Sequence, residues 1–418
     1  MRKTLWHAFA GNLVLFGLAF LVSCSCLCGK KDSGETPTAG TATVRKPGQD
    51  LDGKELWRFV VSGDSRNCGD VVMPAIAKGA RKDGAQFYWH LGDLRAIYDF
   101  DDDMLQAAKV AGKPKPTIIG YEGSAWDDFI ANQAMPFGDM RFYLGIGNHE
   151  VIPPKSREQF VTQFADWLDT PTLQKQRLDN DPTDHELKAY YHWREGAVDF
   201  IYLDNASADQ FDKEQLGWLL RLLKKDAEDP AILTVVVGMH KALPWSVSCD
   251  HSMNESGEGE RSGVKVYKAL LELQKKPKNI YVLASHSHYF MEEIFNNDHW
   301  ANNGGILEGW IVGTAGAQRY PLPLGADPKK SRTNVYGYLL GTVDSKGRIT
   351  FKFTEVKSGD IPLDVKKRYT ESWIRQACFD GNRRPEPTPD HAKLPEYCTG
   401  AGALEHTSLR AGESKQPR

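Results

Sequence analysis

The stretch LGIGNHE, residues 144–150, closes a short apolar run with two glycines and three polar side chains. The run Arg141–Ile146 predicts a buried strand, so Asn148 and His149 should lie on the turn just after it. In open α/β sheets, ligands bind past the carboxyl ends of the strands, where loops converge. This turn is therefore a candidate binding site, and its partners should follow other strands.

Four other predicted strands also end in a turn that carries an Asp or a His. These residues are Asp64 after Trp57–Ser62, Asp93 after Gln86–Leu91, His240 after Ile232–Val237, and His286 and His288 after Asn279–Ala284. Taken singly, a Gly-Asp pair is most often a turn or a helix cap, and a lone His is most often structural. Five such turns in one chain instead predict that the residues meet at a shared metal site.

The rest of the pattern predicts an α/β fold, because helical stretches alternate with the strands. The predicted helices are Val71–Lys82, Ser124–Gln133, Arg157–Leu168, Lys213–Lys224 and Gly263–Gln274. A hairpin-like pair, Tyr190–Trp193 with Val198–Leu203, and a late all-β stretch from Gly309 to Glu355 depart from simple alternation. A four-layer α/β/β/α sandwich accommodates both features.

Composition limits the classes of function. The 418 residues are 41% hydrophobic and 26% charged, which is ordinary for a globular protein with one large domain or two smaller ones. The formal charge of -3, from 52 basic and 55 acidic side chains, provides no long-range field for nucleic acid. Specificity should therefore come from a local site.

The N-terminus predicts export. Arg2 and Lys3 precede an apolar run, Leu13–Val22, that is too short to span a bilayer comfortably, so residues 1–23 form a predicted signal peptide. The segment ends at Cys24 in a sequence that resembles a bacterial lipobox, which predicts a lipid-anchored protein in the periplasm or at the cell surface. A plain secretory signal or an uncleaved anchor is the alternative. Residues 24–50, with almost no large apolar side chain, predict a flexible tether.

The tether precedes a predicted domain at residues 51–357 and an irregular tail at 358–418. Cysteines of an exported protein can form disulfides. Four cysteines lie beyond the N-terminal segment, namely Cys68, Cys249, Cys378 and Cys398, and four cysteines allow three pairings. We favour Cys378 with Cys398, which are close in sequence, and Cys68 with Cys249, each of which follows a candidate metal motif. Buried free thiols are the alternative.

With these motifs in order, the sequence resembles the calcineurin-like metallophosphoesterases, a superfamily that includes the purple acid phosphatases. The resemblance covers roughly residues 56–355, and its most specific part is the block at 147–150 followed by the His286-x-His288 pair. It implies two divalent or trivalent ions, of zinc, iron or manganese. The implied ligands are Asp93 as the bridge, Asp64 and His288 for the first ion, and Asn148, His240 and His286 for the second. His149 would contact the substrate phosphate and protonate the leaving group.

One residue departs from the family pattern. The family has a His two residues after the first Asp, and this chain has Arg66 there. An arginine does not ligate metals because it stays protonated. The first ion would then bind weakly or recruit Tyr98 or Asp99, and Arg66 would contact a substrate phosphate or form a structural ion pair. Glu150 would orient His149, or would simply be a helix-start carboxylate.

Two further segments carry weaker signals. The acidic run Asp101–Asp103 predicts a solvated loop or helix start, close enough to a motif to touch the site. Trp245, His251 and the stretch Ser252–Gly263 predict a flexible loop that could gate a pocket.

The function that these expectations favour is metal-dependent hydrolysis of a phosphorylated small molecule, as a monoester or a diester. The alternative is a binding protein that kept the fold and lost catalysis, which Arg66 motivates. A serine esterase is disfavoured, because no Gly-x-Ser-x-Gly motif is present.

Overall fold

The structure is a computed structural model that describes residues 55–206, 210–385 and 398. The chain divides into a unit of residues 1–46 and a unit of residues 47–418, and every described residue belongs to the second. The predicted signal peptide and the predicted tether lie outside the described residues, and so do residues 386–397 and 399–418 of the predicted tail. Among the described helices, none combines the length and apolar character needed to cross a bilayer.

Two mixed β-sheets form the centre of the described domain. The first sheet has the order β12-β11-β1-β2-β3 and the second β10-β8-β9-β7-β6-β5-β4. The strands are β1 Glu55–Ser62, β2 Ala85–His90, β3 Arg141–Leu144, β4 Tyr191–Glu195, β5 Val198–Leu203, β6 Thr234–Met239, β7 Asn279–Ala284, β8 Phe290–Glu292, β9 Glu308–Val312, β10 Ser331–Arg332, β11 Tyr336–Asp344 and β12 Ile349–Val356. Strands β1 to β3 are mutually parallel, and so are β5, β6, β7 and β9.

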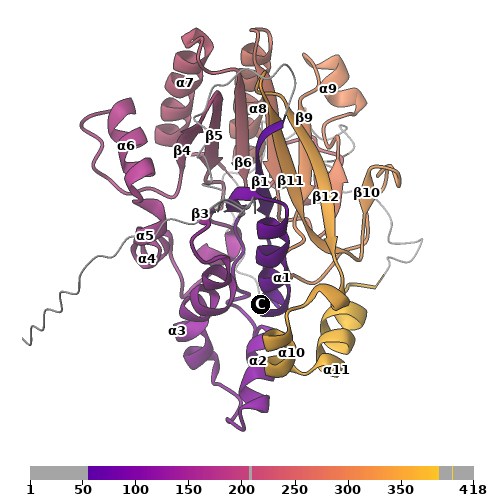
Figure 1. Cartoon of the computed structure of the whole chain (residues 1–418). Coiled ribbons are helices and arrows are strands. Elements are labelled where there is room, and N and C mark those ends of the chain that lie inside the picture. Colours follow the sequence, from indigo (N-terminus) through magenta and orange to yellow (C-terminus); the bar gives the residue numbers. More distant parts are fainter. Residues whose placement is uncertain (1–54, 207–209, 386–397, 399–418) are drawn as a thin grey trace, which may run out of the picture. The chain divides into compact units, whose positions relative to one another are not determined.

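Alternation along the strands divides the core into layers, because successive side chains point to opposite faces of a sheet. In β1, Phe59 joins the cluster between the two sheets, while Val60 packs with helix α1 (Gly69–Lys82). In β5, Phe200 faces the first sheet, while Ile201 packs with residues of α7 (Lys213–Glu228) and α8 (Gly257–Gln274). Helices thus cover the outer face of each sheet (Figure 1). The predicted four-layer α/β/β/α architecture is confirmed.

The remaining helices connect these layers. They are α2 Asp102–Val110, α3 Ile118–Phe129, α4 Arg157–Gln163, α5 Ala165–Leu168, α6 Pro171–Asn180, α9 Asp298–Asn302, α10 Leu363–Tyr369 and α11 Glu371–Trp373, with short or irregular turns η1 Ile130–Ala134, η2 Met135–Phe137, η3 Asn148–Val151, η4 Cys249–His251, η5 Met253–Glu255, η6 Ser358–Asp360 and η7 Ile374–Gly381. The flexible loop predicted at Ser252–Gly263 is wrong. Ser256 caps α8 by accepting from Gly259 N, so a serine N-cap begins a helix there.

The irregular tail predicted from residue 358 onward is also wrong for its described part. Helix α10 and turn η7 pack Val365, Tyr369 and Ile374 into the same cluster as α1. The Tyr369 hydroxyl donates to Asp70 Oδ2 at 2.7 Å. The apolar side chains are spaced for a helix, but charged residues separate them, and this masked the pattern in the sequence.

Both predicted disulfide pairings are wrong. Cys68 pairs with Cys378, and Cys249 pairs with Cys398. The physical reason is the packing of the C-terminal helices on α1, which brings Cys378 to the start of that helix. Closeness in sequence therefore misled the pairing, whereas each observed bridge joins a loop near the candidate site to the C-terminal segment.

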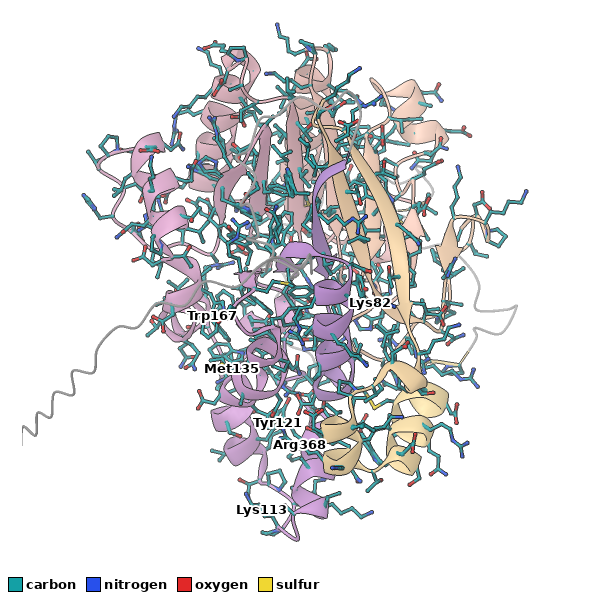
Figure 2. All side chains as sticks on the ribbon, in the orientation of Figure 1. Lys82, Lys113, Tyr121, Met135, Trp167 and Arg368 are labelled. Carbon is teal, nitrogen blue, oxygen red and sulfur yellow. A yellow bond between two sulfur atoms is a disulfide. The ribbon has the colours of Figure 1, made fainter. Side chains whose placement is uncertain are left out.

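The acidic run at 101–103 is a helix start, as predicted, but only its middle residue, Asp102, is exposed. Asp101 and Asp103 are fully buried around Arg95, which also pairs with Asp70 and Asp128. These groups lie where α2, α3 and α10 meet, the end of the domain at which Tyr121 and Arg368 are labelled in Figure 2. The cluster fixes the segment after β2, because an arginine needs partners for its five N–H groups when buried.

Candidate metal centre

Six side chains from five strand-end turns converge at one edge of the two sheets. They are Asp64 after β1, Asp93 after β2, Asn148 at the start of η3, His240 after β6, and His286 and His288 after β7. Two groups of ligand atoms each fit within 4.8 Å, namely Asp93 with His240 and His286, and Asp64 with Asp93 and His288. The first sheet supplies the carboxylates and the amide, and the second supplies the imidazoles.

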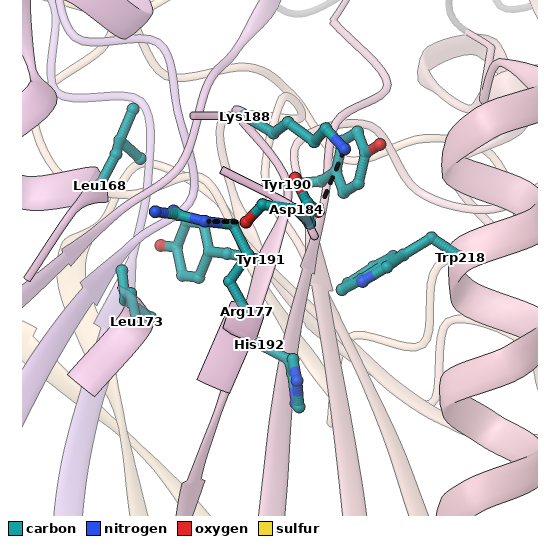
Figure 3. A pocket seen from close by; sticks show the side chains of 9 residues that line it. All are labelled: Leu168, Leu173, Arg177, Asp184, Lys188, Tyr190, Tyr191, His192 and Trp218. Atoms are coloured by element: carbon teal, nitrogen blue, oxygen red, sulfur yellow. Dashed lines mark hydrogen bonds and ion pairs between the residues drawn. The ribbon is translucent and has the colours of Figure 1, made fainter. Parts of the chain in front are cut away.

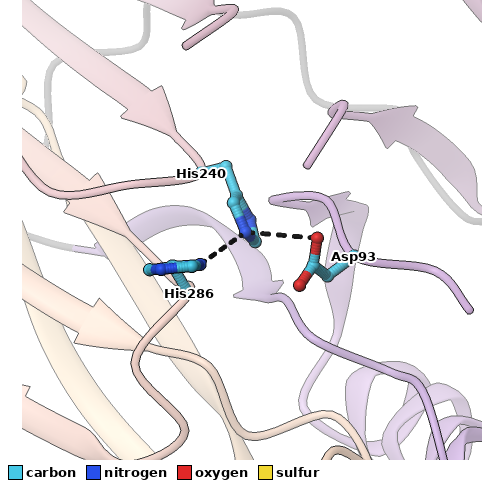
Figure 4. Close-up of side chains that lie close together, drawn as sticks. All are labelled: Asp93, His240 and His286. Atoms are coloured by element: carbon cyan, nitrogen blue, oxygen red, sulfur yellow. Dashed lines mark hydrogen bonds and ion pairs between the residues drawn. The ribbon is translucent and has the colours of Figure 1, made fainter. Parts of the chain in front are cut away.

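His240 stands at the centre of the first group (Figure 4). Its Nδ1 lies 2.9 Å from the carbonyl oxygen of Leu91, so this nitrogen carries the proton and donates it. Its Nε2 lies 3.2 Å from Asp93 Oδ1, 3.0 Å from Asn148 Oδ1 and 3.1 Å from His286 Nδ1. Asp93 Oδ1 and Asn148 Oδ1 carry no proton of their own and only accept, so these lone pairs converge on His240 Nε2 and suit a shared cation.

His288 is oriented in the same way. Its Nδ1 lies 2.6 Å from the carbonyl oxygen of Gln318 and must donate to it. Its Nε2 therefore points at Asp64 Oδ1, 3.2 Å away. A backbone carbonyl that fixes the tautomer of a ligand histidine is a common feature of protein metal sites.

The backbone is strained at three of the six candidate ligands. Asp64, Asp93 and His286 have φ angles of 60°, 61° and 64°. Residues with side chains adopt this left-handed region at a cost of roughly 1–3 kcal/mol each, and such residues cluster at functional sites. The strain is held by hydrogen bonds, including His286 N to Asp64 Oδ2 at 2.8 Å.

Glu150 fixes the loop of Asp93, not the ring of His149 as one of our two interpretations had it. Its carboxylate is fully buried and accepts from three backbone N–H groups, those of Asp93 and Leu94 at 2.9 Å and of Gly147 at 2.7 Å. The alternative interpretation, a carboxylate at a helix start, is also seen, because Glu150 caps η3. Glu150, which caps η3, thus also positions the turn that carries the Asp93 carboxylate.

Arg66 lies inside the site, with only 8% of its surface exposed. Its guanidinium donates to Nε2 of His149 and, at 3.2 Å, to Nε2 of His288. It also reaches the hydroxyls of Tyr98 and Tyr320, at 3.5 and 3.4 Å. Asp99 takes no part in these contacts. The interpretation of Arg66 as a plain structural ion pair is replaced by contacts with imidazoles and phenols.

His149 is buried beside Asp93. Its Nδ1 donates to the carbonyl oxygen of Ala96 at 2.6 Å, which leaves the lone pair on Nε2. Burial and the charge of Arg66 lower the pKa of His149 to about 4, although Asp93 opposes them. At neutral pH the ring is therefore neutral and has no proton on Nε2.

Asp93 and His240 shift each other's pKa in opposite directions. Burial raises the pKa of Asp93, but the charges of His149 and His240 outweigh it and hold that pKa well below its usual range. Burial lowers the pKa of His240, but Asp93 overrides burial and raises it to about 9. A positive charge between these side chains is thus stabilised, whether it is a proton or a metal ion.

Tyr320 and Arg384 also lie at the site, although no sequence motif marked them. The ring of Tyr320 lies 4.0 Å from that of His288, and Arg384 donates to its hydroxyl at 2.9 Å. His251, which the sequence placed in a predicted loop, also stacks on Tyr320, with the ring centroids 5.3 Å apart. Neither Tyr320 nor Arg384 belongs to a local sequence motif. Arg384 reaches the site only through the fold of the C-terminal segment.

The donor set fits a metal ion. Asp64 Oδ1 and Asp93 Oδ2 are buried and accept no hydrogen bond. A buried carboxylate oxygen without a donor is unfavourable unless a cation neutralises it. Carboxylate, amide and imidazole groups together suit zinc, iron or manganese.

A separate pocket lies beside β4 and α7 and contains none of these residues. It is lined by Leu168, Leu173, Arg177, Asp184, Lys188, Tyr190, Tyr191, His192 and Trp218 (Figure 3). Lys188 and Asp184 form an ion pair across it at 3.2 Å. The pocket therefore contains an ion pair and none of the six candidate ligands, which distinguishes it from the metal-site edge.

Comparison with known proteins gives structural neighbours only. No family model and no curated protein matches the sequence. A purple acid phosphatase from yellow lupin (Lupinus luteus) is 15% identical over 80% of this chain and 57% of its own, with a TM-score of 0.47. The structure titled as PhoD is 15% identical over 78% of both chains, with a TM-score of 0.46. A dimetal phosphatase from Danio rerio is 11% identical over 71% of this chain and 99% of its own, with a TM-score of 0.44.

Proposed function

We propose that this protein hydrolyses phosphate esters, as a phosphomonoesterase or phosphodiesterase that depends on a bound metal. The observation that carries the proposal is the set of opposed lone pairs around His240 Nε2, where Asp93, Asn148 and His286 all come within 3.2 Å. Buried acceptors that face one another repel, so such a cluster needs a positive charge at its centre, and a metal ion supplies one. Metal-centred hydrolysis is the chemistry that these ligands support best.

When bound, the metal would supply a water of lowered pKa and would stabilise negative charge on the reacting phosphate. The chain's own residues then bind and orient the substrate. The guanidinium of Arg66 presents its two Nη groups toward the site, and the Tyr320 hydroxyl, held by Arg384, lies beside it. Planar guanidinium groups bind phosphate oxygens well.

Proton transfer is assigned to His149. In the reaction the ester P–O bond breaks, the water oxygen replaces it, and the proton lost by water ends on the leaving oxygen. The lone pair of His149 Nε2 accepts from Arg66 and lies 3.6 Å from Asp93 Oδ2, and its Nδ1 is fixed on a carbonyl. It can therefore accept a proton at Nε2 and release it at the same atom.

We also propose that the enzyme works outside the cytoplasm, attached to a membrane through a lipid on Cys24. The two disulfides support export, because such bonds persist in oxidising compartments. Replacing Cys24 by Ala should move the protein from the membrane fraction to the soluble fraction. A protein that stays with the membrane after this change contradicts the lipid anchor.

The test of the function is turnover of p-nitrophenyl phosphate and of its bis ester by the purified full chain, loaded with zinc, iron or manganese. We expect hydrolysis that chelation abolishes and that metal restores. The His240→Ala change should reduce it by roughly 100-fold or more, because a metal ligand is lost. The exposed residue His185 provides the matched control, His185→Ala, which should retain full activity.

The binding-protein alternative predicts metal binding with no turnover of either ester. Arg66 favours it, because its guanidinium occupies space beside the ligands. Full hydrolytic activity in His240→Ala would contradict both functions, since neither tolerates loss of that ligand.

A further inference from the structure

We propose that this centre binds one metal ion tightly instead of two, and that the guanidinium of Arg66 takes the place of the other ion. The inference rests on the proposed function and concerns how the site achieves it. It comes from a difference between the two halves of the ligand cluster, which the following contacts define.

The half around His240 offers four groups to one ion. Asp93, Asn148 and His286 surround Nε2 of His240, and none of the four has a basic side chain as a partner for these atoms. His240 and Asn148 are positioned by their strand ends and need no rearrangement to ligate. Four ligands of this type are a full set for a tightly held ion.

The half around His288 offers less. The spacing of Asp64, Asp93 and His288 would also admit an ion, but Asp93 is shared with the other half. The only free lone pair of His288 is on Nε2, because its Nδ1 donates to Gln318. That lone pair already accepts from Arg66 Nη2 at 3.2 Å.

The guanidinium of Arg66 is a buried, hydrogen-bonded part of this half of the site. Its Nη1 donates to His149, and the hydroxyls of Tyr98 and Tyr320 lie within 3.5 Å of it. Only 8% of the surface of Arg66 is exposed. A second ion would have to displace Arg66 from His288 and then lie beside its permanent charge.

Charge balance supports the same arrangement. The site holds two carboxylates, Asp93, which both halves share, and Asp64, which belongs to the half around His288, and the two charges of a single divalent ion balance them. Arg66 then adds one positive charge that faces the substrate, next to the ion. A guanidinium in this position can neutralise phosphate oxygens as a second ion would, with donors in a fixed planar geometry.

The test is a metal count with a readout that does not depend on activity. The full chain is freed of metal, dialysed against manganese, and analysed by elemental analysis and by electron paramagnetic resonance. We expect about one tightly bound ion per chain and the signal of an isolated Mn²⁺. Two tight ions per chain with a spin-coupled signal would overturn the inference, and so would none.

The variant Arg66→His removes the guanidinium and adds an imidazole two residues after Asp64. We expect its count to rise to about two ions, with a coupled signal. Arg348→His is the matched control, because the side chain of Arg348 is 60% exposed and pairs with Asp344; its count should stay at one. If Arg66→His does not fold, the count and signal of the unchanged chain still decide the question.

The outcomes separate this inference from the proposed function. Two ions with hydrolysis of either ester refute the single-ion centre and leave the function intact. One ion without hydrolysis supports the single-ion centre and refutes the function.

Discussion

Replacement of Glu150 by Gln is the sharpest test of how the site is held. The carboxylate accepts three backbone N–H groups, two at Oε2 and one at Oε1. A glutamine can keep its amide oxygen at the position that accepts from Asp93 and Gly147. Its NH₂ group then faces the N–H of Leu94, so two donors meet in a fully buried place.

The magnitude follows from those three bonds. One buried N–H without an acceptor costs about 1–3 kcal/mol, and each of the two remaining bonds weakens by about 1 kcal/mol when its acceptor loses its charge. We therefore expect Glu150→Gln to reduce the free energy of unfolding by about 3–5 kcal/mol. Because the affected N–H groups belong to the Asp93 and Gly147 turns, metal affinity should also fall by about 10–100-fold.

The assay is equilibrium unfolding in guanidinium chloride, followed by tryptophan fluorescence, with metal affinity measured on the same samples. Glu272→Gln is the matched control, because the side chain of Glu272 is 69% exposed and its pair with Lys275 lies on the surface. Its effect should stay within about 0.5 kcal/mol. A Glu150→Gln protein as stable as this control, with unchanged metal affinity, would refute the role of Glu150 as the support of the Asp93 turn.

Three further predictions concern substrate binding, pH and backbone packing. Arg384→Ala should raise KM several-fold with a small change in kcat, because Arg384 donates to the Tyr320 hydroxyl and does not contact the candidate metal ligands. Steady-state kinetics measure both constants, and an unchanged KM contradicts the prediction. Burial and the charge of Asp199 raise the pKa of Asp226 to about 8, so the stability that its protonated form contributes is lost as pH rises through 8. The unfolded carboxyl has a pKa of about 4, so the loss runs from about pH 4 to pH 8. Unfolding free energies over that range should therefore fall less in Asp226→Asn than in the unchanged protein, and parallel curves would exclude the effect. Gly147→Ala should abolish metal binding in a dialysis assay, since a methyl group there would overlap a carboxylate oxygen of the site; wild-type binding would show that the turn can move.

Much of the architecture was predictable because it depends on short-range patterns. Strands β1 and β6 contain the apolar runs Phe59–Val61 and Val235–Val237, and each strand is followed by a turn with a polar side chain. Parallel strands present their carboxyl ends at one edge, so Asp64 and His240 could be expected to meet although they lie in different sheets. Their metal binding stays a prediction until ions are counted.

The parts that failed depend on contacts that are distant in sequence. Cys68 and Cys378 are 310 residues apart, and only the packing of α10 and η7 on α1 brings them together. Asp101 and Asp103 were predicted to be solvated because nothing local shows that Arg95 is buried with them. Arg95 also pairs with Asp70, which lies in a different helix. Local sequence reports the charges of such a cluster, but the fold decides whether they are buried together.

The bridge from Cys68 to Cys378 also bears on what a protease can do to this molecule. Every surface turn of the described residues between those two cysteines lies inside one covalent ring. A single cut in any of them opens the ring but releases no fragment, so both pieces, and the site residues they carry, stay joined. A single cleavage in one of these turns therefore leaves the two pieces joined until the bridge is reduced.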